Sequence, residues 1–150
     1  MCRGFWAKCA MSTSALVLAL FISWTLLLLV LMESVRTWLV LTGNALSNSF
    51  TPDNANQSLF MQRLARAHAN CVENLPVIGG LLLLAIASDL TAITDTLAPW
   101  MLLARVIQSS IHLASLSVLA VNARFTAFAM QIGIAVYWVW ALIAAYRNVA

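Results

Sequence analysis

Three polar side chains occur at helical spacing just before an apolar segment. Arg66, Asn70 and Glu73 stand at i, i+4 and i+7, and the apolar residues 77–87 follow at once. On a helix this spacing places a cation, an amide and a carboxylate on one face. An arginine near the centre of a bilayer costs about 2.5–3.5 kcal/mol on insertion scales. We therefore expect this face to meet a partner, a cavity or a bound ligand rather than lipid.

A second polar face occurs in the next apolar segment. Arg105, Gln108 and His112 stand at i, i+3 and i+7, so a helix again presents polar groups along one side. Two such helices are compatible with a membrane interior if Glu73 pairs with Arg105 or with Arg66 inside the protein. A structural network of that kind is one interpretation of the pattern.

The numbers of opposite charges favour a different interpretation. Four arginines are expected at one mouth of the protein: Arg36, Arg66, Arg105 and Arg124. Glu73 is the single carboxylate expected in the interior, and Glu33 is placed one turn before Arg36 to pair with it locally. One interior carboxylate leaves a surplus of positive charge, which favours a site for an anionic ligand.

The composition indicates how these residues are held. The chain has 150 residues, of which 63% are hydrophobic and 9% charged, so it lacks the charged surface of a soluble domain. Four apolar segments reach the roughly 20 residues that a membrane-spanning helix needs: 14–41, 59–87, 98–121 and 125–146. We expect an all-α, integral membrane four-helix bundle, with residues 1–150 as a single domain.

Several other classes of site find no support in the sequence. The net charge of +3 is scattered, with no basic run of the kind that binds nucleic acid. No metal-ligand spacing, no Ser-His-Asp set and no dinucleotide-binding fingerprint is present. Cys71 lies off the face of Arg66 and is expected to be a packing residue rather than a nucleophile.

The second segment carries a fairly specific motif. The pattern Arg63-x-x-Arg66-Ala-His-x-Asn70-Cys-x-Glu73-x-x-Pro76, followed by Arg105-Val, resembles the MAPEG superfamily of membrane-associated proteins in eicosanoid and glutathione metabolism. The resemblance implies a homotrimer of four-helix subunits surrounded by membrane lipids, with glutathione bound between subunits.

The same resemblance implies roles for individual residues. Arg66, Asn70 and Glu73 would contact the glutathione peptide, and Arg105 would continue that polar site. Arg36 would reach in from the neighbouring subunit. Arg124 best matches the arginine that stabilises the glutathione thiolate in transferases and isomerases of the family.

The third segment departs from the pattern of the eicosanoid synthases. Gln108 and His112 stand where those synthases carry His or Tyr and then Tyr, and Asn74 replaces a tyrosine. We expect Gln108 either to orient the ligand or to form a hydrogen bond between two helices. We expect His112 to be either a core residue or a hydrogen-bond donor into the site. The string around them resembles uncharacterised bacterial members, which implies a bacterial inner membrane rather than a microsomal membrane.

Three functions follow from these observations. The first is a glutathione-dependent transferase or peroxidase that acts on hydrophobic electrophiles or lipid hydroperoxides, with Arg124 activating the thiol. The second is a non-catalytic lipid-binding or scaffold member of the same family. The third is a small four-helix exporter built around an intramembrane carboxylate, for which Glu33 lies too near a helix end.

Overall fold

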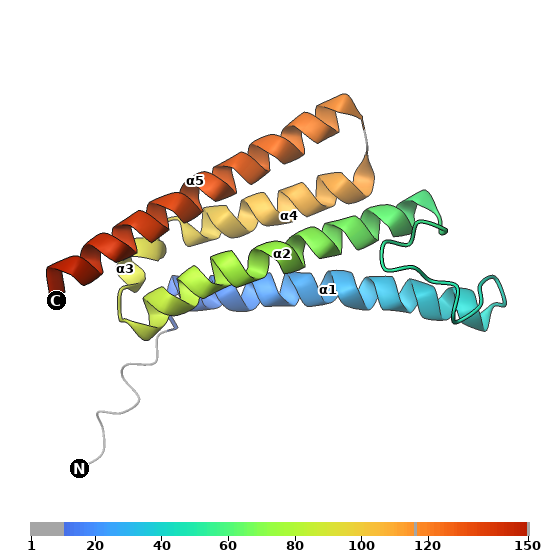
Figure 1. The fold of residues 1–150 in the computed structure, drawn as a ribbon, viewed down its shortest axis with the longest axis horizontal. Coiled ribbons are helices and arrows are strands. Elements are labelled where there is room, and N and C mark those ends of the chain that lie inside the picture. The colour runs from blue at the N-terminus through green and yellow to red at the C-terminus, as the bar shows by residue number, and fades with distance from the viewer. Residues whose placement is uncertain (1–10, 116, 150) are drawn as a thin grey trace, which may run out of the picture.

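The structure, a computed structural model, describes residues 11–115 and 117–149, and the first ten residues of the predicted domain lie outside this part. The elements are α1 (Thr13–Leu41), α2 (Leu59–Ala87), the short α3 (Thr91–Thr94), α4 (Ala98–Ala114) and α5 (Val118–Val149). The four long helices run side by side, with α1 against α2 and α4 against α5 (Figure 1). No strand occurs in the described ranges, so the chain is all-helical there.

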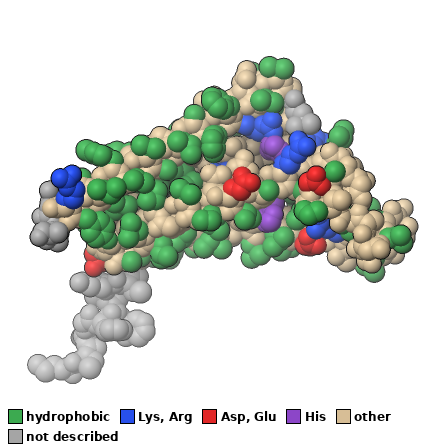
Figure 2. Space-filling view, in the orientation of Figure 1, with side chains coloured by type: hydrophobic (Ala, Val, Ile, Leu, Met, Phe, Trp, Pro, Cys, Tyr) green, Lys and Arg blue, Asp and Glu red, His purple; other side chains and the backbone are tan. Residues whose placement is uncertain are grey.

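Within the described residues, the three helices α1, α2 and α5 are long and apolar enough to cross a membrane. Apolar side chains cover much of the outer face, whereas most of the charged and histidine side chains gather towards one end (Figure 2). The fourth long helix, α4, has 17 residues. It would extend roughly 26 Å at 1.5 Å per residue, slightly less than a hydrocarbon core of roughly 30 Å. The chain is therefore an integral membrane protein.

Serine side chains begin the first two helices. Ser12 Oγ accepts a hydrogen bond from the N–H of Ala15 at 3.2 Å, and Ser58 Oγ accepts one from the N–H of Met61 at 3.4 Å. The two helices approach closely at Gly79, where an added Cβ would lie 3.2 Å from Leu18 Cδ1. A small residue at this position therefore lets α1 pack against α2.

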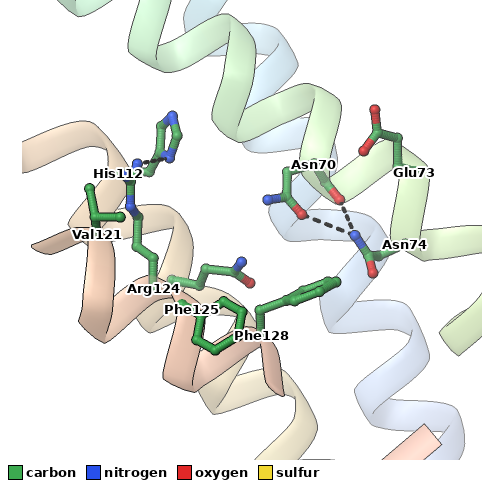
Figure 3. Close-up of a pocket in the computed structure, with 9 residues that line it drawn as sticks. Asn70, Glu73, Asn74, His112, Val121, Arg124, Phe125 and Phe128 are labelled. Atoms are coloured by element: carbon green, nitrogen blue, oxygen red, sulfur yellow. Dashed lines mark hydrogen bonds between the residues drawn. The ribbon is translucent and has the colours of Figure 1, made fainter. Parts of the chain in front are cut away.

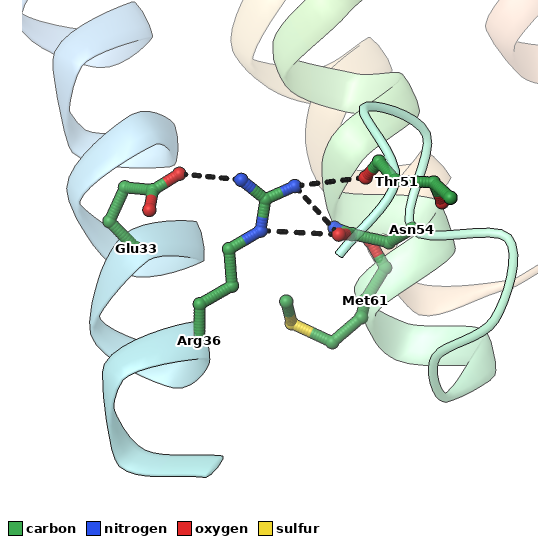
Figure 4. Close-up of polar contacts among 5 residues, drawn as sticks. All are labelled: Glu33, Arg36, Thr51, Asn54 and Met61. Carbon is green, nitrogen blue, oxygen red and sulfur yellow. Dashed lines mark hydrogen bonds and ion pairs between the residues drawn. The ribbon is translucent and has the colours of Figure 1, made fainter. Parts of the chain in front are cut away.

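The loop between α1 and α2 is held by one arginine (Figure 4). The Arg36 guanidinium donates to Glu33 Oε1 at 2.9 Å, to Asn54 Oδ1 at 2.7 Å and to the Thr51 carbonyl at 3.2 Å. Asn54, which is fully buried, in turn donates to the Met61 carbonyl at 3.2 Å. The predicted pairing of Glu33 with Arg36 is confirmed, and these contacts tie the loop to both helices.

The opposite end of the protein is tied through α3. Asp95 Oδ1 accepts hydrogen bonds from the Ser14 N–H at 2.7 Å and from the Ser14 hydroxyl at 2.6 Å. A carboxylate at this position satisfies a free N–H in the first turn of α1 and interacts favourably with the helix dipole. The segment around α3 therefore fixes α1 relative to the start of α4.

The predicted break between the last two long helices was wrong. We expected it around residues 122–124, but α4 ends at Ala114 and α5 begins at Val118. Ser115 has an extended backbone (φ −152°, ψ 152°), and its Oγ accepts from the Ser117 N–H at 3.1 Å. Ser117 Oγ then accepts from the Ala120 N–H at 3.3 Å, as a serine does at a helix start. Arg124 consequently lies inside α5 rather than at its start.

Candidate functional site

A cavity of about 370 Å³ opens between α2, α4 and α5 (Figure 3). Five residues predicted from the sequence line it: Asn70, Glu73, Gln108, His112 and Arg124. They come from all three helices, although they are up to 54 positions apart in the sequence (124 minus 70). The fold therefore brings most of the predicted site residues around one space.

The remaining lining is largely apolar and comes from α5. Val121, Phe125 and Phe128 line the cavity together with Asn74 of α2. Positions 121, 125 and 128 are spaced i, i+4 and i+7, so they share one face of the helix. The Phe125 side chain is 70% exposed. The cavity thus has a polar wall from α2 and α4 opposite an aromatic wall that reaches the outer surface.

Asn70 on the polar wall is held from behind by Arg105. Arg105 Nη1 donates to Asn70 Oδ1 at 2.9 Å, and Asn74 Nδ2 donates to the same oxygen at 3.0 Å. Asn74 Nδ2 also donates to the Asn70 carbonyl at 2.8 Å. Arg105 is 1% exposed. Because the Asn70 oxygen already accepts two hydrogen bonds, its amide N–H groups remain for a ligand.

The proposed ion pair between Glu73 and Arg105 does not form. The single salt bridge in the described part of the chain joins Arg36 to Glu33. Glu73 is exposed at the rim, and its carboxylate is turned away from Arg124 (Figure 3). The Arg105 guanidinium lies 5.6 Å from the centroid of the Phe21 ring, and its Nε and Nη2 atoms have no hydrogen-bond partner in the part of the chain that the structure describes. An amide and an aromatic face therefore hold this buried cation.

Arg124 and His112 meet at the cavity. Arg124 Nη1 contacts His112 Nδ1, and the two side chains extend towards each other from α5 and α4 (Figure 3). The position of His112 depends on the end of α4, where Arg63 Nη1 donates to the Ala114 carbonyl at 3.1 Å. That hydrogen bond satisfies a free carbonyl at the helix end and links it to α2.

Sequence reasoning missed Gln131. Its side chain is fully buried in α5, and Nε2 donates to Gln108 Oε1 at 2.9 Å and to the Ala127 carbonyl at 3.0 Å. Gln131 is the one polar side chain between Ala127 and Val136, and it follows Arg124 by seven residues. A polar residue in an apolar span, on the same helical face as a site residue, was a usable signal.

Four of the singled-out residues are not part of the cavity lining: Arg105, which lies behind Asn70, and Arg36, Arg66 and Cys71. Arg66 is exposed on α2, and Arg36 is bound in the first loop. Their predicted contacts with a ligand or a neighbouring subunit stay predictions. Cys71 is fully buried with Sγ 3.5 Å from Ser109 Oγ, the environment of a packing residue.

The cavity suits a ligand that has both charged and apolar parts. Arg124 supplies a cation, Glu73 supplies a carboxylate at the rim, and the amides of Asn70 and Gln108 supply hydrogen bonds. Within the described residues no group of three or more His, Cys, Asp or Glu side chains is placed to hold a metal ion. The chemistry of the site therefore rests on a guanidinium, amides, an imidazole and a carboxylate.

Comparisons with known proteins identify the family. The model of the MAPEG family matches residues 14–144, which include all four long helices up to the last turns of α5. No curated protein and no solved structure matches the chain significantly. The predicted resemblance is thus confirmed over most of the sequence, and the chain belongs to the MAPEG family of membrane proteins in eicosanoid and glutathione metabolism.

Proposed function

We propose that this chain is the subunit of a trimeric four-helix membrane enzyme that binds glutathione and presents its thiolate to a hydrophobic electrophile or a lipid hydroperoxide. The observation that carries the proposal is the cavity in which Asn70, Gln108 and His112 face Arg124 and the aromatic wall of α5. A tripeptide with two carboxylates, an ammonium group and a thiol matches this combination of a cation, amide donors and a rim carboxylate.

Arg124 is the residue proposed to activate the thiol. A free thiol has a pKa of about 8.5, and the thiolate rather than the thiol is the nucleophile. A guanidinium at the cavity stabilises the negative sulfur and so raises the reactive fraction at neutral pH. Glu73 at the rim would receive the ammonium group of the peptide, and Asn70 would donate to a carboxylate or amide oxygen.

The aromatic wall is proposed to receive the second substrate. Phe125 and Phe128 lie beside Arg124 on α5, and Phe125 is 70% exposed on a helix that is able to cross a membrane. A hydrophobic compound dissolved in the bilayer would therefore reach the thiolate without passing through water.

Exposed charges on α2 support assembly of several copies. Arg66 and Glu73 are both exposed on a helix apolar enough to span a membrane. A neighbouring subunit that covers them would avoid the cost of placing these charges against lipid. A bacterial inner membrane is proposed for the trimer because the third segment resembles that of bacterial members, and Arg36 of one copy would approach the site of the next.

The test is a titration of the purified protein in detergent with glutathione, which follows calorimetric heat and the ultraviolet absorbance of the thiolate together. Arg124→Ala should retain binding and lose the thiolate signal, whereas Glu73→Ala should lose binding. Arg147→Ala removes the same charge from the far end of α5 and is the matched control. Unchanged binding and an unchanged thiolate signal in both site variants would refute the assignment.

A specific observation favours a second candidate, the non-catalytic lipid-binding member. A groove of about 560 Å³ runs along the end of α1. Its lining is mostly apolar, from Leu29, Val30, Trp38 and Leu41, and it also includes Glu33, Ser34 and Thr37. A lipid chain fits such an apolar surface. This function predicts that radiolabelled fatty acid binds and that bound glutathione gives no thiolate signal, so the same titration separates the two candidates.

A further inference from the structure

The side chains of Arg124 and His112 are partners of each other at the cavity. Arg124 Nη1 contacts His112 Nδ1, and neither side chain makes a second hydrogen bond among the described residues. The two residues come from different helices, and both line the cavity. Arg124 is a long side chain with many rotamers, so this one contact decides where its guanidinium lies.

The chemistry of the two groups fixes the protonation of His112. A guanidinium can only donate hydrogen bonds, so His112 Nδ1 must be the acceptor (Figure 3). A ring that accepts a hydrogen bond at Nδ1 is neutral and carries its proton on Nε2. In the part of the chain that the structure describes, this Nε2 is buried without a partner. His112 therefore acts as an acceptor for Arg124 rather than as a link to a third helix.

The positive charge of Arg124 is not offset by a carboxylate. Arg124 forms no salt bridge within the described residues, and the carboxylate of Glu73 at the rim is turned away from it (Figure 3). The other charged side chains close enough to act on the His112 ring are two cations of α2, Arg63 and Arg66. A neutral acceptor thus holds the Arg124 guanidinium and leaves its charge intact.

Stability does not explain a histidine at position 112. A buried N–H without a partner is costly, and a leucine at this position would avoid that cost. Long basic side chains near the end of a membrane helix extend to the membrane surface when nothing holds them. The imidazole is therefore explained by its effect on Arg124.

We propose that His112 is a positioning residue for thiol activation. Its neutral ring holds the Arg124 guanidinium at the cavity, where the positive charge stabilises the glutathione sulfur after the thiol proton has left to the solvent. The inference rests on the proposed function and adds a second residue to its activating group. A carboxylate in place of the imidazole would hold Arg124 at least as firmly, but its negative charge would oppose the thiolate. An aliphatic side chain would leave the charge intact and the guanidinium unheld.

Three variants of nearly equal shape separate the holding of Arg124 from the preservation of its charge. The side chains of Asn, Asp and Leu all branch at Cγ, the atom that carries Nδ1 in histidine. His112→Asn keeps a neutral acceptor at that branch, His112→Asp introduces a charged acceptor, and His112→Leu has no acceptor. Each protein in detergent is saturated with glutathione, and the thiolate absorbance is followed against pH. The midpoint is the pH at which half of the bound thiol is ionised.

The proposal predicts an order of midpoints. His112→Asn should keep the wild-type midpoint, and His112→Leu should raise it by about one pH unit, which is a tenfold lower ratio of thiolate to thiol at a given pH. His112→Asp should raise the midpoint by at least as much. In the Arg124→Ala background, His112→Leu should cause no further change, because His112 acts through Arg124. Calorimetry should show that every variant still binds glutathione.

The matched control is His68→Asn, which makes the same change at the other histidine of the chain. His68 is half-buried on α2 and does not line the cavity, so its replacement should leave the midpoint unchanged. The melting temperature of each variant reports on folding. If His112→Leu does not fold, the comparison of His112→Asn with His112→Asp still decides the question, because these two variants differ in charge alone.

The outcomes distinguish this inference from the proposed function. A wild-type midpoint in His112→Leu, or the same raised midpoint in His112→Asn and His112→Leu, would overturn the positioning role. A wild-type midpoint in His112→Asp would mean that the contact only joins α4 to α5. A further loss in the Arg124→Ala background would mean that His112 meets the sulfur itself, which also overturns the role. All of these results leave glutathione binding in place, whereas a wild-type protein without binding or without a thiolate signal would overturn the proposed function and this inference together.

Discussion

Replacement of Arg105 by methionine should weaken ligand binding while it changes stability very little. Arg105 is 1% exposed, and its Nε and Nη2 atoms have no hydrogen-bond partner among the described residues. Each unsatisfied buried group costs on the order of 1–3 kcal/mol. Methionine has a similar length and no charge, so Arg105→Met removes both of these costs.

The interactions that Arg105 makes are of similar size. Its hydrogen bond to Asn70 at 2.9 Å contributes about 1.5–3 kcal/mol as a bond to a charged group. The Phe21 ring, 5.6 Å away, contributes up to about 2 kcal/mol. Costs and gains nearly cancel, so the free energy of unfolding should change by less than about 2 kcal/mol.

Binding should respond differently from stability. Without Arg105 the Asn70 oxygen keeps only the hydrogen bond from Asn74, so the amide is held less firmly with its N–H groups towards the ligand, and glutathione affinity should decrease about tenfold. Unfolding in a denaturing detergent measures the stability, and calorimetry measures the affinity. The matched control is Met101→Ala, at a residue of the same helix that is also 1% exposed, which should cost about 2–5 kcal/mol and leave Asn70 in place. A stability loss as large as that of the control, with unchanged affinity, would refute the reasoning.

Three further changes test the contacts that hold the helices in place. Asn54→Ala removes the contacts to Arg36 and to the Met61 carbonyl, and should expose the first loop to limited proteolysis and cost about 1–3 kcal/mol. Asp95→Ala removes the acceptor at the start of α1 and should lower the melting temperature, at a cost of about 0.5–2 kcal/mol. Ser117→Ala removes the cap of α5 and should cost about 1 kcal/mol, with increased amide hydrogen exchange confined to the first turn of α5. An unchanged melting temperature in either cap variant, or unchanged proteolysis of Asn54→Ala, would contradict the assigned contact.

Hydropathy was sufficient to place the first two helices but not the last two. The predicted segments 14–41 and 59–87 agree closely with α1 and α2. An apolar run of that length in a membrane satisfies its backbone hydrogen bonds by forming a helix, so its structure is readily predicted. The break before α5 was missed because it depends on two serine side chains within residues 113–121, which are otherwise apolar. A window average is insensitive to Ser115 and Ser117, whereas their hydrogen bonds decide where α5 starts.

Helical spacing predicted which residues share a face but not which of them turn inward. Arg66, Asn70 and Glu73 lie within about 60° of one another at 100° per residue. Asn70 lies at the edge of this group where α4 packs, so it meets Arg105, whereas the other two remain exposed. We expected a carboxylate as the partner of Arg105 because opposite charges attract, but its partner is the amide oxygen of Asn70. The contact between Arg105 and Asn70 depends on how α2 is rotated about its own axis relative to α4. Helical spacing in the sequence does not predict that rotation.

Most of the buried polar atoms that lack a hydrogen-bond partner among the described residues belong to side chains near the cavity. Six buried side-chain atoms of the described residues have no hydrogen-bond partner, and four of them belong to Arg105, His112 and Gln131. Each of these three residues directs a group that lines the cavity: Arg105 fixes Asn70, Gln131 fixes Gln108, and His112 contacts Arg124. Apolar residues at these positions would make a more stable membrane bundle. We therefore explain the polar side chains at these three positions by ligand binding, because the ligand needs Asn70, Gln108 and Arg124 held in fixed orientations.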